Sequence, residues 1–119
     1  MKNLGGFILG VRGFSRMEQF YQINNILSGL EEDEYFVDFL NTKSLEAGII
    51  KLRKDRKDTQ TSHPLDELYY VIRGDGYIRI GEKSQPVNQG TIIFVPAGSD
   101  HNFYGNKGDL VVLYIFPKH

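Results

Sequence analysis

The 119-residue chain is predicted to fold as an all-β sandwich or barrel with a short N-terminal helix or arm. Short runs of β-branched and aromatic residues recur along the sequence, and turn-forming glycines separate them. The sequence does not alternate strands with long helical segments, as a parallel sheet would require, and it contains no internal repeat. The length is sufficient for one hydrophobic core but not for two.

The amino-acid composition limits which partners the chain could bind and which chemistry it could use. Hydrophobic residues make up 40% of the chain and aromatic residues 13%, which is typical of a globular protein. The net charge of −1 provides no basic field for nucleic acid and no charged surface for a membrane. Cysteine is absent, so disulfides, thiolate metal ligands and a cysteine nucleophile are excluded. A bound metal would have to use nitrogen and oxygen ligands.

The first residues combine a lysine with a short apolar run, as a secretory signal does. Arg12 interrupts that run, and no small-residue cleavage site follows it. We therefore interpret this segment as an arm or edge strand. No apolar segment reaches the length of a membrane span, so we expect a cytoplasmic protein without a membrane partner.

A short amphipathic helix is predicted within Ser15–Leu30. Met17, Phe20 and Leu27 follow helical spacing, and Ser15 could cap the helix with Glu18 three residues later. The helix would pack on the barrel or at a dimer contact. The N-terminal arm and helix would occupy about residues 1–30, and the barrel about residues 34–117 of a single domain.

Four strands are predicted outside the central region of the chain. Gly48, within the second of them, suggests a bulge or bend. The last strand is apolar on both faces and must be buried centrally in a sheet or against another subunit. These strands cover Tyr35–Leu40, Ser44–Arg53, Gln85–Asn88 and Asp109–Pro117.

The segment Lys51–Asp58 is a dense run of charges of both signs. Its mixed signs predict a solvated loop rather than an anion site. Arg53 is the exception, because it lies at the end of an apolar strand and could reach into the barrel mouth.

The central region carries the first group of metal-ligand residues. His63 precedes Glu67, and Pro64 between them favours a bend that lets the two side chains converge. An apolar strand follows Glu67, and a glycine-rich turn then leads to a second strand at Tyr77–Ile80. We expect these two strands to form a hairpin.

A second stretch, Gly90–His101, supplies another ligand. It is an apolar strand closed by a proline- and glycine-containing turn that leads directly to His101. Two neutral imidazoles and a carboxylate suit a divalent ion such as zinc, iron, manganese or nickel. Three protein ligands, His63, Glu67 and His101, would leave open positions for water or substrate, as catalytic metal sites do.

Together, the two stretches resemble the motifs of a single-domain cupin. Thr61 departs from the pattern, because it stands where the family usually has its first histidine, and Gly105 stands where an asparagine is common. The resemblance implies a double-stranded β-helix, the RmlC-like jelly roll, from roughly residue 34 to residue 116. The matching positions are His63, Glu67 and Gly74 in the first motif and Gly90, Pro96, Gly98 and His101 in the second.

Several further residues are candidates for a pocket with an apolar body and a few hydroxyl donors. That make-up is common in small-molecule sites, although aromatic residues in small barrels mostly pack. The candidates are Arg53, Thr61, Tyr69, Tyr77, Arg79, Phe103, Tyr104 and Tyr114.

Two functions remain open at this stage. One is a metal-dependent enzyme acting on a small organic substrate, since similar cupins include dioxygenases, isomerases and sugar-modifying enzymes. The other is a small-molecule binding or sensing module whose metal site is weakened or lost, which the threonine at position 61 would permit. In both cases we expect a homodimer, because residues 35–40 and 109–116 are apolar on both faces.

Overall fold

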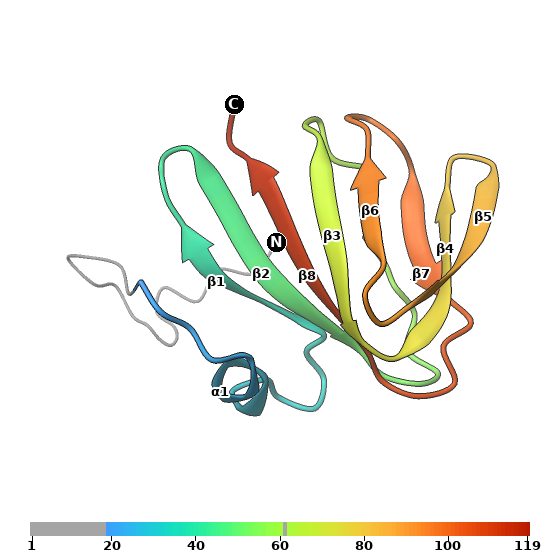
Figure 1. Ribbon diagram of the computed structural model, residues 1–119, viewed down its shortest axis with the longest axis horizontal. Coiled ribbons are helices and arrows are strands. Elements are labelled where there is room, and N and C mark those ends of the chain that lie inside the picture. The colour runs from blue at the N-terminus through green and yellow to red at the C-terminus, as the bar shows by residue number, and fades with distance from the viewer. Residues whose placement is uncertain (1–18, 61) are drawn as a thin grey trace.

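A computed structural model describes residues 19–60 and 62–119. Within these residues, one short helix precedes eight strands, in agreement with the predicted all-β class (Figure 1). The elements are α1 (Ile23–Ser28), β1 (Phe36–Asn41), β2 (Leu45–Leu52), β3 (Glu67–Arg73), β4 (Asp75–Ile80), β5 (Lys83–Asn88), β6 (Ile92–Val95), β7 (His101–Tyr104) and β8 (Leu110–Pro117).

The strands form two antiparallel sheets that enclose the core. The larger sheet has the order β1-β2-β8-β3-β6, and the smaller has the order β5-β4-β7. Side chains alternate along each strand, so one face of each sheet contributes to the core. The predicted jelly roll is confirmed. Over the described residues, no helix is long and apolar enough to cross a membrane.

The last strand lies in the middle of the larger sheet. β8 pairs with β2 on one side and with β3 on the other, and most of its side chains are buried. The prediction that this apolar segment is buried centrally in a sheet is therefore confirmed. It packs within the main core cluster, which comprises Ile50, Leu52, Tyr69, Val71, Ile78, Val87, Ile93, Val95, Phe103, Leu110, Val112, Tyr114 and Phe116.

The hairpin predicted after Glu67 is wrong. β3 belongs to the larger sheet and β4 to the smaller, so the two strands do not pair. Gly74 lies between them with a φ of +93°, and a Cβ at this position would collide with the carbonyl oxygen of Asp109. The glycine therefore lets the chain pass from one sheet to the other. A hairpin would instead have required a loop that joins two paired strands.

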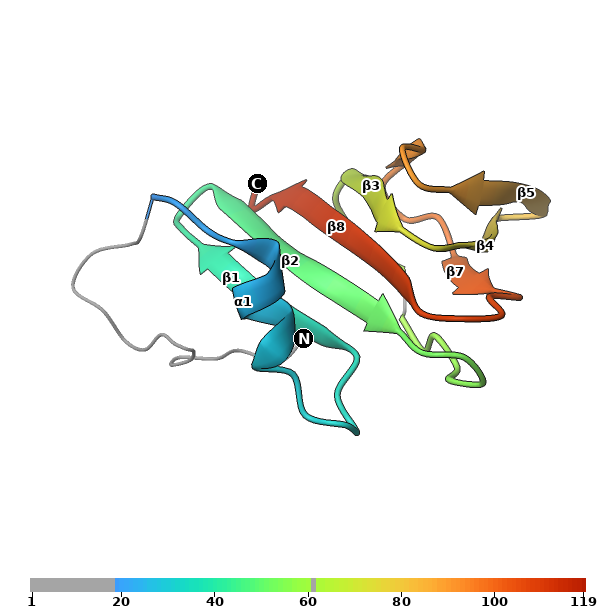
Figure 2. The same ribbon diagram turned by 60° about the horizontal axis from the view of Figure 1, so that its bottom comes forward.

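The helix is shorter than predicted. α1 covers Ile23–Ser28, whereas the prediction extended over Ser15–Leu30, and the proposed Ser15 cap lies outside the described residues. Leu27 packs with Ile49 and Val111 on the outer face of the larger sheet. Figure 2 shows α1 lying over β1 and β2. Part of the second apolar face is thus covered within the chain.

The glycine expected to mark a bulge has another role. The bulge lies in β1, between Asp38 and Leu40, and Gly48 on β2 is opposite it. The Tyr114 ring crosses above Gly48, and its hydroxyl donates a hydrogen bond to the buried Asp38 carboxyl. Since a Cβ at residue 48 would collide with that ring, only glycine leaves room for the contact.

Candidate functional site

A histidine and a glutamate face each other inside the barrel. Glu67 begins β3 in the larger sheet, and His101 begins β7 in the smaller sheet. Both side chains are buried, and His101 Nε2 lies 3.6 Å from Glu67 Oε1. Because side chains alternate along a strand, the sequence neighbours of Glu67 and of His101 point outward, and these two side chains point into the interior.

A backbone carbonyl fixes the orientation of the His101 ring. Its Nδ1 lies 3.0 Å from the carbonyl oxygen of Ser99, which can only accept a hydrogen bond. Nδ1 must therefore carry a proton, and in the neutral ring Nε2 is the unprotonated nitrogen. Histidines that bind metals commonly have their other ring nitrogen held in this way.

A buried tyrosine completes the cluster. The Tyr69 hydroxyl lies 2.9 Å from His101 Nε2 and 3.1 Å from Gln60 Oε1, and both atoms can accept its proton. Burial raises the pKa of Tyr69 well above its usual value, and the Glu67 and Asp58 carboxylates raise it further. The phenol therefore stays protonated and donates to one of the two acceptors at a time.

The carboxyl group of Glu67 is poorly solvated. Burial raises its pKa above the usual value, and the nearby His101 and His63 oppose this effect. A buried carboxylate of this kind needs a positive partner, such as an imidazolium or a cation, to remain ionised. We name Glu67, Tyr69 and His101, with Gln60, the inner cluster.

The third predicted ligand lies at the edge of the barrel. His63 is half-buried, its ring centroid is 4.1 Å from that of Phe116, and its Nδ1 accepts a hydrogen bond from the Leu65 N–H at 3.2 Å. Its carbonyl accepts a 2.7 Å hydrogen bond from the Gly98 N–H, which joins the two motif stretches. Across residues 19–60 and 62–119, no three histidine, aspartate or glutamate side chains form a group that could hold a metal.

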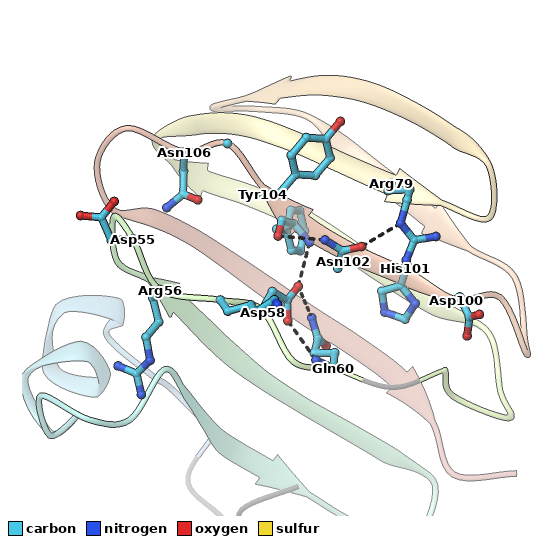
Figure 3. A pocket seen from close by; sticks show the side chains of 13 residues that line it. Asp55, Arg56, Asp58, Gln60, Arg79, Asp100, His101, Asn102, Tyr104 and Asn106 are labelled. Atoms are coloured by element: carbon cyan, nitrogen blue, oxygen red, sulfur yellow. Dashed lines mark hydrogen bonds between the residues drawn. The ribbon is translucent and has the colours of Figure 1, made fainter.

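A cavity of about 570 Å³ adjoins the inner cluster (Figure 3). The segment 55–60 forms one wall, and β7 with Arg79 of β4 forms the other. Its size is ordinary for a small-molecule site. Three cationic and three anionic residues line it, so the expected apolar body is wrong for this cavity. The lining residues are Asp55, Arg56, Lys57, Asp58, Gln60, Arg79, Asp100, His101, Asn102, Phe103, Tyr104, Gly105 and Asn106.

Asp58 connects the wall formed by segment 55–60 to the wall formed by β7 through hydrogen bonds. This buried carboxylate accepts hydrogen bonds from the Phe103 N–H at 2.8 Å and from the Gln60 N–H and side-chain amide at 3.2 and 3.1 Å. It lies at the end of the charge run that was predicted to be a solvated loop, and for Asp58 that prediction is wrong. By orienting Gln60, it also places an acceptor for Tyr69.

The remaining pocket candidates lie in different places. Arg53 donates a 2.8 Å hydrogen bond to the Glu34 carbonyl instead of reaching into the barrel mouth. Phe103 and Tyr114 are buried in the core. Tyr77 lies on the outward face of the smaller sheet, stacked on Tyr104, because it alternates with the buried Ile78.

Two further candidates complete the comparison with the sequence. Arg79 also faces outward, where its Nε donates a 2.9 Å hydrogen bond to the Asn102 side chain and the residue lines the cavity. Thr61 lies outside the described residues. The sequence analysis assigned no role to Asp58 or Gln60. The polar run that ends in Asp58 contained no periodic signal that could have revealed either role.

Comparison with known proteins gives the family. The model of the Cupin domain family matches residues 48–116, more than half of the chain. The chain belongs to the cupin family. An uncharacterized protein of Streptomyces coelicolor, SCO3923, is 33% identical to this cupin over 84 residues, which cover 71% of this chain and 80% of that relative.

Solved structures agree with this cupin at the level of the fold. An RmlC-like cupin from Shewanella frigidimarina superposes with a TM-score of 0.72 and 16% identity, covering 89% of this chain and 96% of the other. KdgF from Halomonas sp. superposes with a TM-score of 0.64 and 19% identity, over 71% and 77% of the two chains. At these identities, the likeness concerns the fold and not the chemistry.

Proposed function

We propose that this cupin binds one divalent metal ion at the inner cluster and acts on a small polar organic substrate that enters through the adjoining cavity. The observation that carries the proposal is the buried pair of Glu67 and His101, whose nearest atoms lie 3.6 Å apart. A carboxylate oxygen and an unprotonated imidazole nitrogen at this spacing are suitable neighbouring ligands for one ion.

The donor set fits zinc, iron, manganese or nickel, since it consists of nitrogen and oxygen atoms. Glu67 and His101 would hold the ion, and His63 would join them by giving up its hydrogen bond with the Leu65 N–H. A bound ion would supply Lewis acidity to substrate oxygens. A buried cation would also stabilise the ionised form of the Glu67 carboxyl group, which burial disfavours.

A rearrangement of hydrogen bonds within the chain can free His101 Nε2 to bind a metal ion. While the Tyr69 proton is directed at His101 Nε2, that nitrogen is occupied. Gln60 Oε1 lies 3.1 Å from the same hydroxyl, so a rotation of the O–H bond moves the proton to Gln60 and frees Nε2. Tyr69 stays protonated throughout because burial raises its pKa. It would then provide a fixed hydroxyl beside the bound substrate.

The cavity lining favours a polar substrate. Its walls present charged side chains of both signs, and Arg79 and Asn102 add donors on the outer side. His101 and Gln60 belong both to the cavity lining and to the inner cluster, so a ligand in the cavity would lie next to them. Polar groups fixed by neighbouring hydrogen bonds, as Gln60 is by Asp58, give a ligand site its orientation.

A second candidate function is a binding or sensing module without a tightly held metal. The observation that favours it is the position of His63, whose Nδ1 is already engaged and whose ring packs on Phe116. With two ligands instead of three, metal affinity would be low, and the cavity would serve for ligand binding alone.

Metal analysis of protein purified without chelators distinguishes the two. After growth with added zinc, iron, manganese and nickel, we expect about one ion per chain. Glu67→Gln, which keeps the shape of the side chain, should lower affinity at least tenfold, or about 1.4 kcal/mol. Asp100→Asn, at an exposed carboxylate of the cavity, is the matched control and should retain the ion.

Each outcome distinguishes the metal-dependent function from the binding module. A metal-free wild-type protein would refute the metal-dependent function and favour the binding module. A stoichiometric ion that Glu67→Gln does not weaken would show that the ion lies elsewhere. Binding of small polar compounds to the metal-free protein, followed by thermal stability, would then test the second candidate.

A further inference from the structure

The cavity extends around the free edge of strand β7. The smaller sheet has the order β5-β4-β7, so β7 is outermost among its described strands. The buried residues of β7, His101 and Phe103, line the cavity from the inner face of the sheet, whereas Asn102 and Tyr104 line it from the outer face. A ligand in the cavity can therefore contact the inner cluster and the outer face of the smaller sheet at the same time.

An arginine is fixed at the outer side of this edge. Arg79 of β4 lies opposite Asn102 of β7 in the strand register. Its Nε donates a 2.9 Å hydrogen bond to Asn102 Oδ1, and its Nη1 donates a 2.6 Å hydrogen bond to the carbonyl oxygen of Gly81. Figure 3 shows the guanidinium group on the same side of the cavity as His101 and Asp100. Because a guanidinium is planar and rigid, these two hydrogen bonds fix its orientation before any ligand binds.

The positive charge of Arg79 has no carboxylate partner in the described part of the chain. Both of its acceptors are neutral groups, whereas Lys51 lies 3.8 Å from the Asp109 carboxylate. Arg79 is half-buried, and buried charges are normally paired with an opposite charge. Within residues 19–60 and 62–119 its Nη2 group has no acceptor, so the guanidinium retains donors for an anion.

The other two cations of the cavity are less suited to hold an anion. The guanidinium of Arg56 donates hydrogen bonds to the carbonyl oxygens of Glu32 and Asp33, which do not line the cavity. Figure 3 shows this side chain turned away from Arg79. Lys57 is exposed, and an exposed lysine is a flexible point charge. Arg79 is therefore the cation that a ligand in the cavity would meet in a fixed position.

We propose that the cavity binds the carboxylate group of its substrate through Arg79. This inference rests on the proposed function, since it takes the cavity to be the substrate site. A carboxylate matches the planar guanidinium, and its single charge balances the one that Arg79 leaves uncompensated. A phosphate group carries nearly two charges at neutral pH, and the carboxylates of Asp58 and Asp100 in the same lining would repel it more strongly.

This placement leaves the rest of the substrate beside the inner cluster. With its carboxylate at Arg79, a small acid would extend past the edge of β7 toward Gln60 and His101, which belong both to the cavity lining and to the inner cluster. Arg79 would then determine specificity, because it selects acids over neutral molecules of the same shape. It would hold the substrate in one orientation without contacting the reacting atoms.

Titration of the isotope-labelled protein, followed by NMR, provides the test. The probes are propanoate, the neutral propanamide of nearly the same shape, and inorganic phosphate. We expect propanoate to shift the amide signals of β7 with a millimolar Kd, and to bind at least about tenfold more tightly than propanamide or phosphate. Arg79→Gln removes the charge, so it should weaken propanoate binding at least about tenfold and leave propanamide binding unchanged.

A second arginine provides the matched control. Arg73 is exposed at the end of β3 and does not line the cavity, so Arg73→Gln should bind propanoate as the wild type does. Arg79→Lys keeps the charge but not the planar group, and it serves as the second variant if Arg79→Gln does not fold. It should weaken propanoate binding at least about threefold.

The proposal is overturned if propanamide or phosphate binds the wild type as tightly as propanoate does. It is also overturned if the Arg79 variants bind propanoate as the wild type does, or if Arg73→Gln weakens binding as much as they do. Metal content, measured on the same samples, distinguishes this inference from the proposed function. Selective propanoate binding by a metal-free wild type would refute the metal-dependent function alone. A stoichiometric ion without selective propanoate binding would refute this inference alone.

Discussion

Replacing Asp58 by alanine should be among the most destabilising single changes in the wall of the cavity. Its carboxylate accepts hydrogen bonds from the backbone N–H of Phe103 and from two N–H groups of Gln60. The alanine variant leaves the N–H of the buried Phe103 without a partner, at a cost of about 1 to 3 kcal/mol. The lost charge-assisted bonds from Gln60 add to this cost, and relief of the buried charge offsets part of it.

We expect a net loss of about 3 kcal/mol in the free energy of unfolding for Asp58→Ala. Asp58→Asn should lose about half of that, because the retained oxygen can still accept from the Phe103 N–H and the Gln60 side-chain amide, while the new amide group faces the Gln60 backbone N–H. Asp100→Ala, which removes an exposed carboxylate from the same cavity, should change stability by less than about 0.5 kcal/mol.

Urea unfolding followed by circular dichroism measures all three variants, and an unchanged slope with denaturant shows that the comparison is valid. The reasoning fails if Asp58→Ala loses no more stability than Asp100→Ala. That result would mean that segment 55–60 does not depend on this carboxylate for its position beside β7.

Three further changes test other parts of the structure. Gly48→Ala should destabilise by about 1 to 3 kcal/mol or more, since its Cβ collides with the Tyr114 ring; wild-type stability in urea would contradict this. Burial and a hydrogen bond with Glu46 raise the pKa of Asp38 from 3.8 to about 8. The fold therefore favours the protonated form, and stability should fall by about 1.4 kcal/mol per pH unit between these values, a slope that Asp38→Asn should abolish. Thr61→His should tighten metal binding about tenfold in chelator competition; unchanged affinity would mean that residue 61 does not face the ion.

The sequence was sufficient to predict every strand except β7 and to identify Glu67 and His101 as candidate ligands. β-branched and aromatic runs separated by glycines predicted the strands, because both signals are local. Motif spacing identified Glu67 and His101, and in the fold one begins β3 and the other β7, so that they face each other across the interior. For these features, the local pattern and the tertiary structure agree.

Other features depend on tertiary contacts that a linear pattern does not contain. The Gly74 turn has the chemistry of a hairpin, and only the pairing of β3 with β6 and β8 shows that the chain changes sheets there. Asp58 is buried because Phe103, distant in sequence, presents an N–H to it. The position of His63 on Phe116 likewise follows from packing between distant segments.

The alternation of side chains along β3 links the two faces of the larger sheet. Glu67 and Tyr69 point into the inner cluster, while Leu68 and Tyr70 are 43% and 41% exposed on the outer face of the sheet. A shift of one residue in the register of this strand would exchange the two sets, so that Leu68 and Tyr70 would be buried and the Glu67 carboxyl and Tyr69 hydroxyl would lose their places in the inner cluster.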